Sequence, residues 1–249
     1  MANPQWTDLA ALPGVSDAVE HARLAIMALR RHPANRKGWP RTAAAASIRA
    51  ARASAALDGA PLALELDSAV VTDPILAGAV RVGSAIATMA TVWPRSPLQV
   101  LARLHTLAAA DLIQPDELGR PRVDDPTVSP GLARFAELVT GNRWPAPVQV
   151  AVVHGQLLTL APFGAANGVV ARAAARLSMI STGLDPAGLG VPEAAHLRSG
   201  TRYPELAARF AAGRPADLTE WILDVCRCLT AGAREGISIA DAAVNGAVG

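Results

Sequence analysis

Two consecutive apolar segments, residues 145–160 and 166–181, constrain the fold more than any other feature of this sequence. Each has room for about four helical turns, and residues 145–160 contain no Asp, Glu, Lys or Arg. A helix that is apolar on every side must be buried by its neighbours. Because only residues 161–165 connect the two segments, we predict two buried helices packed together at the centre of the protein.

The remaining composition indicates an all-α fold. Apolar residues make up 51% of the chain but aromatic residues only 4%, so Ala, Leu, Val and Ile must build the core. Alanine is the strongest helix former. Amphipathic periodicity and proline or glycine punctuation predict further helices over Ser16–Arg31, Arg41–Leu57, Pro74–Val92, Pro97–Leu112, Pro130–Thr140, Pro192–Ser199, Tyr203–Ala211 and Asp217–Ala233.

The segments between these helices predict how the chain is organised. We expect Ser16 and Glu20 to cap the first helix, Asn35–Pro40 to form a polar turn, and Leu62–Val71 to be a short extended piece. Residues 114–130, which are polar and rich in proline, indicate a long loop. With no repeat and no clean linker, we predict one helical-bundle domain over 47–234, an N-terminal helical arm over 1–46 and a tail over 235–249.

Several classes of protein fit this sequence poorly. The formal net charge of +2 is too small to indicate nucleic-acid binding. Cys226 and Cys228 point to opposed sides of a helix, so they neither pair nor share a metal, and no other metal-ligand spacing is present. Residues 74–94 are long enough to span a membrane, but Arg81 lies at their middle. Without a signal peptide at the first residues, we expect a cytoplasmic protein with no membrane partner.

The connection between the two central helices is the best candidate for a binding site. It reads Ala-Pro-Phe-Gly-Ala-Ala-Asn-Gly, and Arg172 follows four residues after the last glycine. The first backbone N–H groups of a helix have no partner within the helix and lie at its positive end, which favours an anion. The candidate anion-binding or nucleotide-binding residues are Phe163, Gly164, Asn167, Gly168 and Arg172.

These residues resemble the signature of the Fic (fido) family, His-x-Phe-x-(Asp/Glu)-Gly-Asn-Gly-Arg-x-x-Arg. The match runs without gaps, with Phe163 on the phenylalanine, Asn167 and Gly168 on Asn-Gly, and Arg172 on the final arginine. The flanking helices resemble those of the family as well, over about 47–234. The resemblance implies an all-α Fic-type fold, and family members mostly transfer AMP from a nucleotide to a protein hydroxyl.

The departures from the signature bear on activity. Ala161 stands where the family has the histidine that acts as general base, and a methyl group accepts no proton. Ala165 replaces the acidic residue that holds magnesium, Ala166 replaces a glycine, and Val169 replaces the first arginine, which neutralises phosphate charge. Loss of a general base typically costs about 10²–10⁴-fold in rate, so little catalysis is expected.

Two histidines lie near the signature, and neither replaces the missing base. His154 falls on a histidine common in the family's preceding helix, but it lies about 10 Å before Ala161 along the helix. Direct proton transfer needs about 3 Å. We interpret His154, and likewise His105, as buried histidines that hydrogen-bond within the core.

A second resemblance lies at Ser54-Ala-Ala-Leu-Asp58-Gly59. Many Fic proteins carry an inhibitory helix of the form (Ser/Thr)-x-x-x-Glu-(Gly/Asn), whose glutamate pairs with the last arginine of the signature. Here Asp58 takes the place of that glutamate, and a buried Arg172 would need such a partner. The other interpretation is that Asp58-Gly59 merely ends a helix.

The sequence therefore predicts a degenerate Fic-domain protein, a catalytically impaired pseudoenzyme that binds a protein partner, or a nucleotide such as ATP, at the remnant site. The alternative is residual or altered nucleotidyl or phosphoryl transfer that depends on Asn167, Gly168 and Arg172. We predict no catalytic residue and no protein anchor for a metal. The identity of the partner and the presence of a homodimer stay open.

Overall fold

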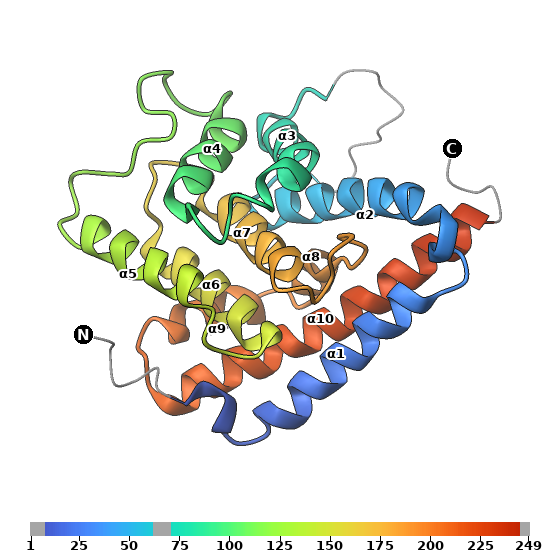
Figure 1. Ribbon diagram of the computed structural model, residues 1–249. Helices are drawn as coiled ribbons and strands as arrows, with labels where there is room; N and C mark the ends of the chain where they lie inside the picture. Colours follow the sequence, from blue (N-terminus) through green and yellow to red (C-terminus); the bar gives the residue numbers. More distant parts are fainter. Residues whose placement is uncertain (1–7, 62–70, 245–249) are drawn as a thin grey trace.

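A computed structural model describes residues 8–61 and 71–244, and every regular element in these ranges is a helix, as predicted (Figure 1). A 3-10 helix, η2, covers Leu9–Ala11. The α-helices are α1 (Val15–Arg31), α2 (Asn35–Leu57), α3 (Pro74–Met89), α4 (Pro97–Ala109), α5 (Val128–Gly141), α6 (Ala146–Leu160), α7 (Asn167–Ser181), α8 (Pro192–Arg198), α9 (Arg202–Phe210) and α10 (Pro215–Val244).

Helices α6 and α7 lie at the centre, as their apolar sequences predict. Val153 and Leu157 of α6 pack into a core shared with α3, α4, α5 and α7. Residues on the other side of α6, such as Val148 and Val152, pack into a second core formed with α1, α9 and α10. Residues 147–155 of α6 are buried between the two cores and have no face left for water, which explains why this stretch carries no charge.

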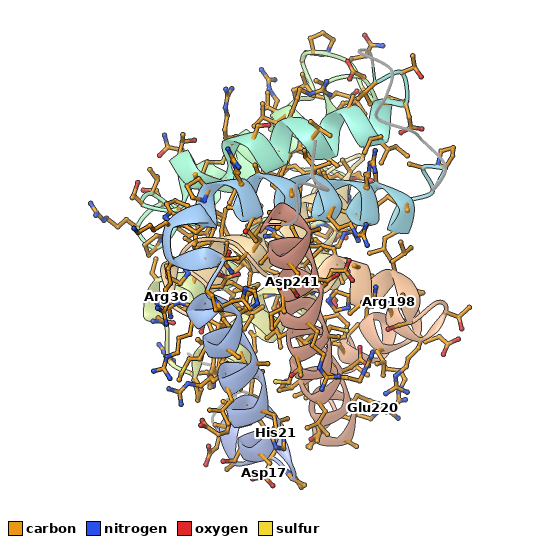
Figure 2. All side chains as sticks on the ribbon, turned by 90° about the vertical axis from the view of Figure 1, so that its right-hand side faces the viewer. Asp17, His21, Arg36, Arg198, Glu220 and Asp241 are labelled. Carbon is orange, nitrogen blue, oxygen red and sulfur yellow. The ribbon has the colours of Figure 1, made fainter. Side chains whose placement is uncertain are left out.

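Helices α1 and α10 run parallel along one side of the molecule (Figures 1 and 2). At one end, a Cβ placed on Gly14 would lie 3.8 Å from Leu223. At the other end, His32 Nε2 lies 3.2 Å from Asp241 Oδ1. The two helices are therefore close to each other at both ends of α1.

Two expectations for the first helices are wrong. The segment Asn35–Pro40 is helical and opens α2, with the Asn35 side chain donating a hydrogen bond to the Leu29 carbonyl at 2.9 Å. That contact anchors the helix start, and Pro40 lies inside α2 although it provides no N–H. The predicted cap is also absent: α1 follows Gly14, and Glu20 bonds to Arg23 at 2.9 Å.

The last helix is longer than predicted. Helix α10 continues past Ala233 to Val244, so residues 235–244 of the predicted tail are helical. The predicted helix ended at Ala233, but α10 continues through Gly236, where a Cβ would lie 2.5 Å from the Leu189 carbonyl oxygen. The glycine permits close packing, and the buried Ala240 continues that contact face. Most of the predicted extended piece Leu62–Val71 lies outside the described residues.

Two further features of the described residues agree with the sequence. No helix among them combines the length and apolar character needed to cross a membrane. Arg81, the charged residue within the apolar segment 74–94, donates to the Leu107 carbonyl at 2.9 Å and pairs with Asp111 at 2.7 Å.

Cys226 and Cys228 are both free and buried, and burial raises the pKa of each thiol to about 12.

Candidate functional site

The turn between α6 and α7 has an unusual backbone at both ends. Helix α6 is followed by Ala161, whose φ is 40°, and α7 is preceded by Ala166, whose φ is 54°. Both angles are left-handed, a region that costs an alanine roughly 1–2 kcal/mol and a glycine very little. The turn thus keeps at Ala166 the conformation that the glycine of the resembled signature would adopt without strain.

Asn167 closes the turn with its side chain. Its Oδ1 accepts a hydrogen bond from Phe163 N at 3.0 Å, and its Nδ2 donates to Phe163 O at 2.7 Å. Both polar ends of the amide are therefore used inside the turn. Asn167 shapes the candidate site, and its side chain is committed to this pair of contacts.

His105 supports the turn from α4. Its ring stacks on Phe163 with centroids 4.1 Å apart and planes 6° from parallel. Gly119 N donates to His105 Nδ1 at 2.9 Å, so the ring is neutral and carries its proton on Nε2. Burial lowers the pKa of His105 to about 4, against a smaller opposite effect of the Ala165 backbone. The interpretation of His105 as a buried, hydrogen-bonded residue is confirmed.

The loop that follows α4 also contacts the turn, which the sequence did not reveal. Arg122 N donates to Pro162 O at 2.8 Å, and Arg122 Nε donates to Ala161 O at 3.1 Å. Asp124 and Asp125 lie 3.6 Å from the guanidinium of Arg122. Arg122 therefore holds the segment in which Ala161 replaces the general base of the signature. Local sequence patterns do not encode this contact, because it joins distant parts of the chain.

The start of α7 is occupied by a carboxylate from the end of α2. Val169 N donates to Asp58 Oδ2 at 3.0 Å, and Arg172 Nη2 donates to Asp58 Oδ1 at 2.6 Å. A Cβ placed on Gly168 would lie 2.2 Å from Asp58 Oδ1. The glycine is thus required for the approach of the carboxylate, and the anion position at this helix start is filled from within the chain.

Arg172 is almost completely buried, and each of its nitrogens has a partner. Its Nε donates to Ser54 Oγ at 2.8 Å, Nη2 donates to the Ser54 carbonyl at 2.9 Å, and Nη1 lies 3.5 Å from the Tyr203 hydroxyl. The side chain of Arg172 is 3% exposed and that of Asp58 22%. The predicted ion pair is present, with Ser54 one turn before Asp58 completing the contact.

The charges around Arg172 are balanced. Burial lowers the pKa of Arg172, but Tyr203 and Asp58 outweigh burial and raise the pKa above its usual value. Burial raises the pKa of Tyr203, so the phenol stays neutral. Burial, His196 and Arg172 all lower the pKa of His154, whose Nε2 lies 2.8 Å from the Tyr203 hydroxyl. His154 is a buried, hydrogen-bonded core residue, as interpreted from the sequence.

The positions that depart from the signature lie in two environments. Val169 is 3% exposed and packs in the core with α3, α4 and α5. Ala161 and Ala165 are partly exposed at the turn, and Gly164 is exposed.

Two cavities that Arg172 helps to line measure about 30 and about 10 Å³, enough for about one water molecule at most. The guanidinium is therefore enclosed by protein in this conformation.

A second cluster, which the sequence did not predict, joins α8 to α10. Donor atoms of His196, Asp224 and Cys228 lie within 4.8 Å of one another. The Asp224 carboxylate already accepts hydrogen bonds from Arg202 at 3.1 Å and Arg227 at 2.9 Å. A cation would meet these two guanidiniums, so we assign the cluster a structural role as a buried ion-pair network.

Comparison with proteins of known structure identifies the fold of this chain. No protein-family model matches the sequence, and no curated protein matches it significantly. Among solved structures, the chain is similar to a Fic family protein from Desulfovibrio desulfuricans G20, with a TM-score of 0.73 and 19% identity over 95% of this chain and 77% of that one. It is also similar to Fic-1 from C. elegans, with a TM-score of 0.63 and 16% identity over 90% of this chain and 71% of that one.

A variant of the same Fic-1 segment gives a TM-score of 0.64 at 17% identity, again over 90% of this chain and 71% of that one. The similarity covers 90–95% of this chain in all three comparisons. The chain therefore has the Fic fold.

Proposed function

We propose that this protein is a Fic-fold pseudoenzyme whose anion site is held closed by its own Asp58. The observation that carries the proposal is the Asp58 carboxylate, which accepts from Val169 N at 3.0 Å and from Arg172 Nη2 at 2.6 Å. A phosphate at the start of α7 would need the same N–H group and the same guanidinium. Anion binding and the Asp58 contact therefore exclude each other.

The groups that would turn an anion site into a transferase are missing around the turn. Ala161 and Ala165 have no titratable atom, so neither accepts a proton from a target hydroxyl nor holds a metal. Val169 packs in the core and contributes no charge. Of the side chains near the turn, Asn167 is bonded to Phe163 and His105 is bonded to Gly119. Binding, without chemistry, is the function that this arrangement supports best.

The bound species depends on the position of the α2 end. With Asp58 in place, the site offers no anion position, and the scaffold acts by binding a protein partner. If Asp58 is withdrawn, Arg172 and the N–H groups of α7 become free for a phosphate-bearing ligand such as ATP. The remnant site is then a conditional anion site rather than a catalytic one.

Transfer of label from ATP tests this proposal. The purified protein and its Asp58→Ala variant are incubated with α-labelled ATP, magnesium or manganese, and cell-extract proteins. We expect no labelled protein in either case, because relief of the Asp58 contact restores neither base nor metal ligand. Transfer that is lost in an Asn167→Ala variant would instead support the residual transferase.

A restored variant serves as the positive control. Ala161→His with Ala165→Glu, in the Asp58→Ala background, returns a base and a metal ligand at two partly exposed positions. Label transfer by this variant, together with none by the parent, would show that the missing side chains are what limits the chemistry.

A further inference from the structure

Helices α1 and α10 leave a shallow groove between them on the face that Figure 2 shows. Its volume is about 870 Å³, and much of its wall consists of small side chains, among them Ala18, Ala25 and Ala28 on α1 and Ala231 on α10. Short side chains permit a third helix to approach both backbones within the 8–10 Å typical of packed helices. The groove alone does not say which helix fills it.

The exposed edge of α1 beside this groove has a regular pattern. Asp17, His21, Leu24, Ala28 and Arg31 are all exposed and recur at intervals of four and three residues, so they share one face of the helix. Leu24 is 50% exposed, although it is a large apolar residue in a well-packed helix. This set of five residues is called the α1 seam below. Its spacing is that of a helix that packs along another helix.

The α1 seam is complementary to itself. Asp17 and Arg31 each lie seven residues from Leu24, which is roughly 10 Å to either side along the helix. Two copies of α1 packed antiparallel about a two-fold axis at Leu24 therefore bring Asp17 level with Arg31 of the partner subunit, twice. An isologous contact of this kind uses the same patch on both subunits and closes after two copies.

The two charges are free for such a contact. Within residues 8–61 and 71–244, neither Asp17 nor Arg31 makes a salt bridge, whereas Glu20 and Arg23, outside the α1 seam, pair with each other at 2.9 Å. Arg36 and Lys37, both exposed, extend the positive charge beyond Arg31 at the end of the helix that lies opposite Asp17. On α1, the unpaired acidic side chain thus lies at one end of this face and the basic side chains lie at the other.

We propose that the protein forms a two-fold homodimer through the α1 seam, with α1 of each copy lying antiparallel in the α1–α10 groove of the other. Leu24 packs against Leu24 of the partner subunit at the axis, and two Asp17–Arg31 pairs flank it. The proposal does not depend on the proposed function, because the groove lies on a different face from the Asp58–Arg172 site.

Sedimentation velocity of the full chain over about 1–200 μM tests the dimer, and charge reversal tests its register. We expect a concentration-dependent dimer that weakens between about 0.05 and 0.5 M NaCl, since its outer contacts are ion pairs. Asp17→Arg or Arg31→Asp alone places like charges together twice and is expected to weaken association at least about tenfold. The double variant Asp17→Arg/Arg31→Asp restores both pairs and should regain most of the affinity. Leu24→Glu should give a monomer.

A control variant changes a charge on the same helix outside the α1 seam. Arg23 lies about 100° around the helix from Leu24, and Arg23→Asp changes the charge by the same amount as Arg31→Asp while also removing the pair with Glu20. It should leave the association unchanged. Circular dichroism of each variant verifies that the fold is kept, which is expected for exposed positions. A monomeric wild-type protein across this concentration range would overturn the proposal, as would a dimer that tolerates both single reversals or is not rescued by the double one.

Discussion

Asp58 and Arg172 are separated by more than a hundred residues in the chain, yet Asp58 Oδ1 lies 2.6 Å from Arg172 Nη2. The guanidinium is 3% exposed and the carboxylate 22%. A buried cation of this kind needs its counter-charge, so the contact fixes the end of α2 against the start of α7. It also determines what else can bind there.

Removal of the carboxylate should destabilise the fold. We expect Asp58→Ala to lower the free energy of unfolding by about 2–4 kcal/mol, because it leaves Arg172 buried and unpaired. The partial exposure of Asp58 keeps the value below that for a wholly buried pair. Urea denaturation measures the loss. The double variant Asp58→Ala/Arg172→Met should recover part of it, and strictly additive losses would argue against a coupled pair.

The effect of a substitution at Gly168 on stability should depend on the Asp58 carboxylate. A Cβ at this position would lie 2.2 Å from Asp58 Oδ1, so Gly168→Ala must displace Asp58 and should cost about 1–3 kcal/mol. In the Asp58→Ala background the clash is gone, and alanine is the better helix former. There, Gly168→Ala should be neutral or stabilising. Equal costs in both backgrounds, measured by thermal and urea unfolding, would contradict the close approach.

Replacement of Ala166 by glycine should stabilise the protein. Its φ of 54° is strained for alanine and unstrained for glycine. We expect Ala166→Gly to stabilise the protein by about 1 kcal/mol, which corresponds to a rise of about 2–4 °C in Tm for a chain of this length. Ala165→Gly is the matched control, because Ala165 is not among the residues with positive φ. It should lower the Tm, since glycine adds entropy only to the unfolded chain.

Lowering the pH should reduce the free energy of unfolding, because His105 binds a proton more readily in the unfolded chain. The pKa of His105 is about 4 in the folded protein against 6.5 for the free side chain, so the unfolded chain binds more protons between these values. Stability is then full above about pH 6.5 and falls as the pH drops towards 4, by up to about 3 kcal/mol. In His105→Asn, whose Oδ1 can accept from Gly119 N, this part of the pH dependence should vanish. Identical pH profiles for both proteins would contradict the assignment.

The central part of the fold could be predicted because a buried helix needs an apolar sequence. A segment as apolar as 145–160 has no stable place except between other elements, and α6 lies there. A buried Arg172 requires a counter-charge for the same reason. That the counter-charge is Asp58 was predicted from the resemblance of residues 54–59 to an inhibitory helix, and burial alone did not identify it.

The missed features depend on contacts that no local pattern encodes. Asn35 anchors the start of α2 to Leu29, so the helix begins before Pro40, and α10 continues through Gly236, which packs closely against Leu189. Likewise, Arg122 bonds to Ala161 across a long loop. Proline, glycine and a loop arginine have the same local appearance whether or not a distant partner is present.

Binding of pyrophosphate, followed by isothermal titration calorimetry, tests the central claim most directly. The wild-type protein should give no binding heat at millimolar pyrophosphate, because Asp58 occupies Val169 N and Arg172. Asp58→Ala should bind with a dissociation constant on the order of 1 mM, and Asp58→Ala/Arg172→Met should again give none. Wild-type binding as tight as that of Asp58→Ala would contradict the account, since the anion position would then lie elsewhere.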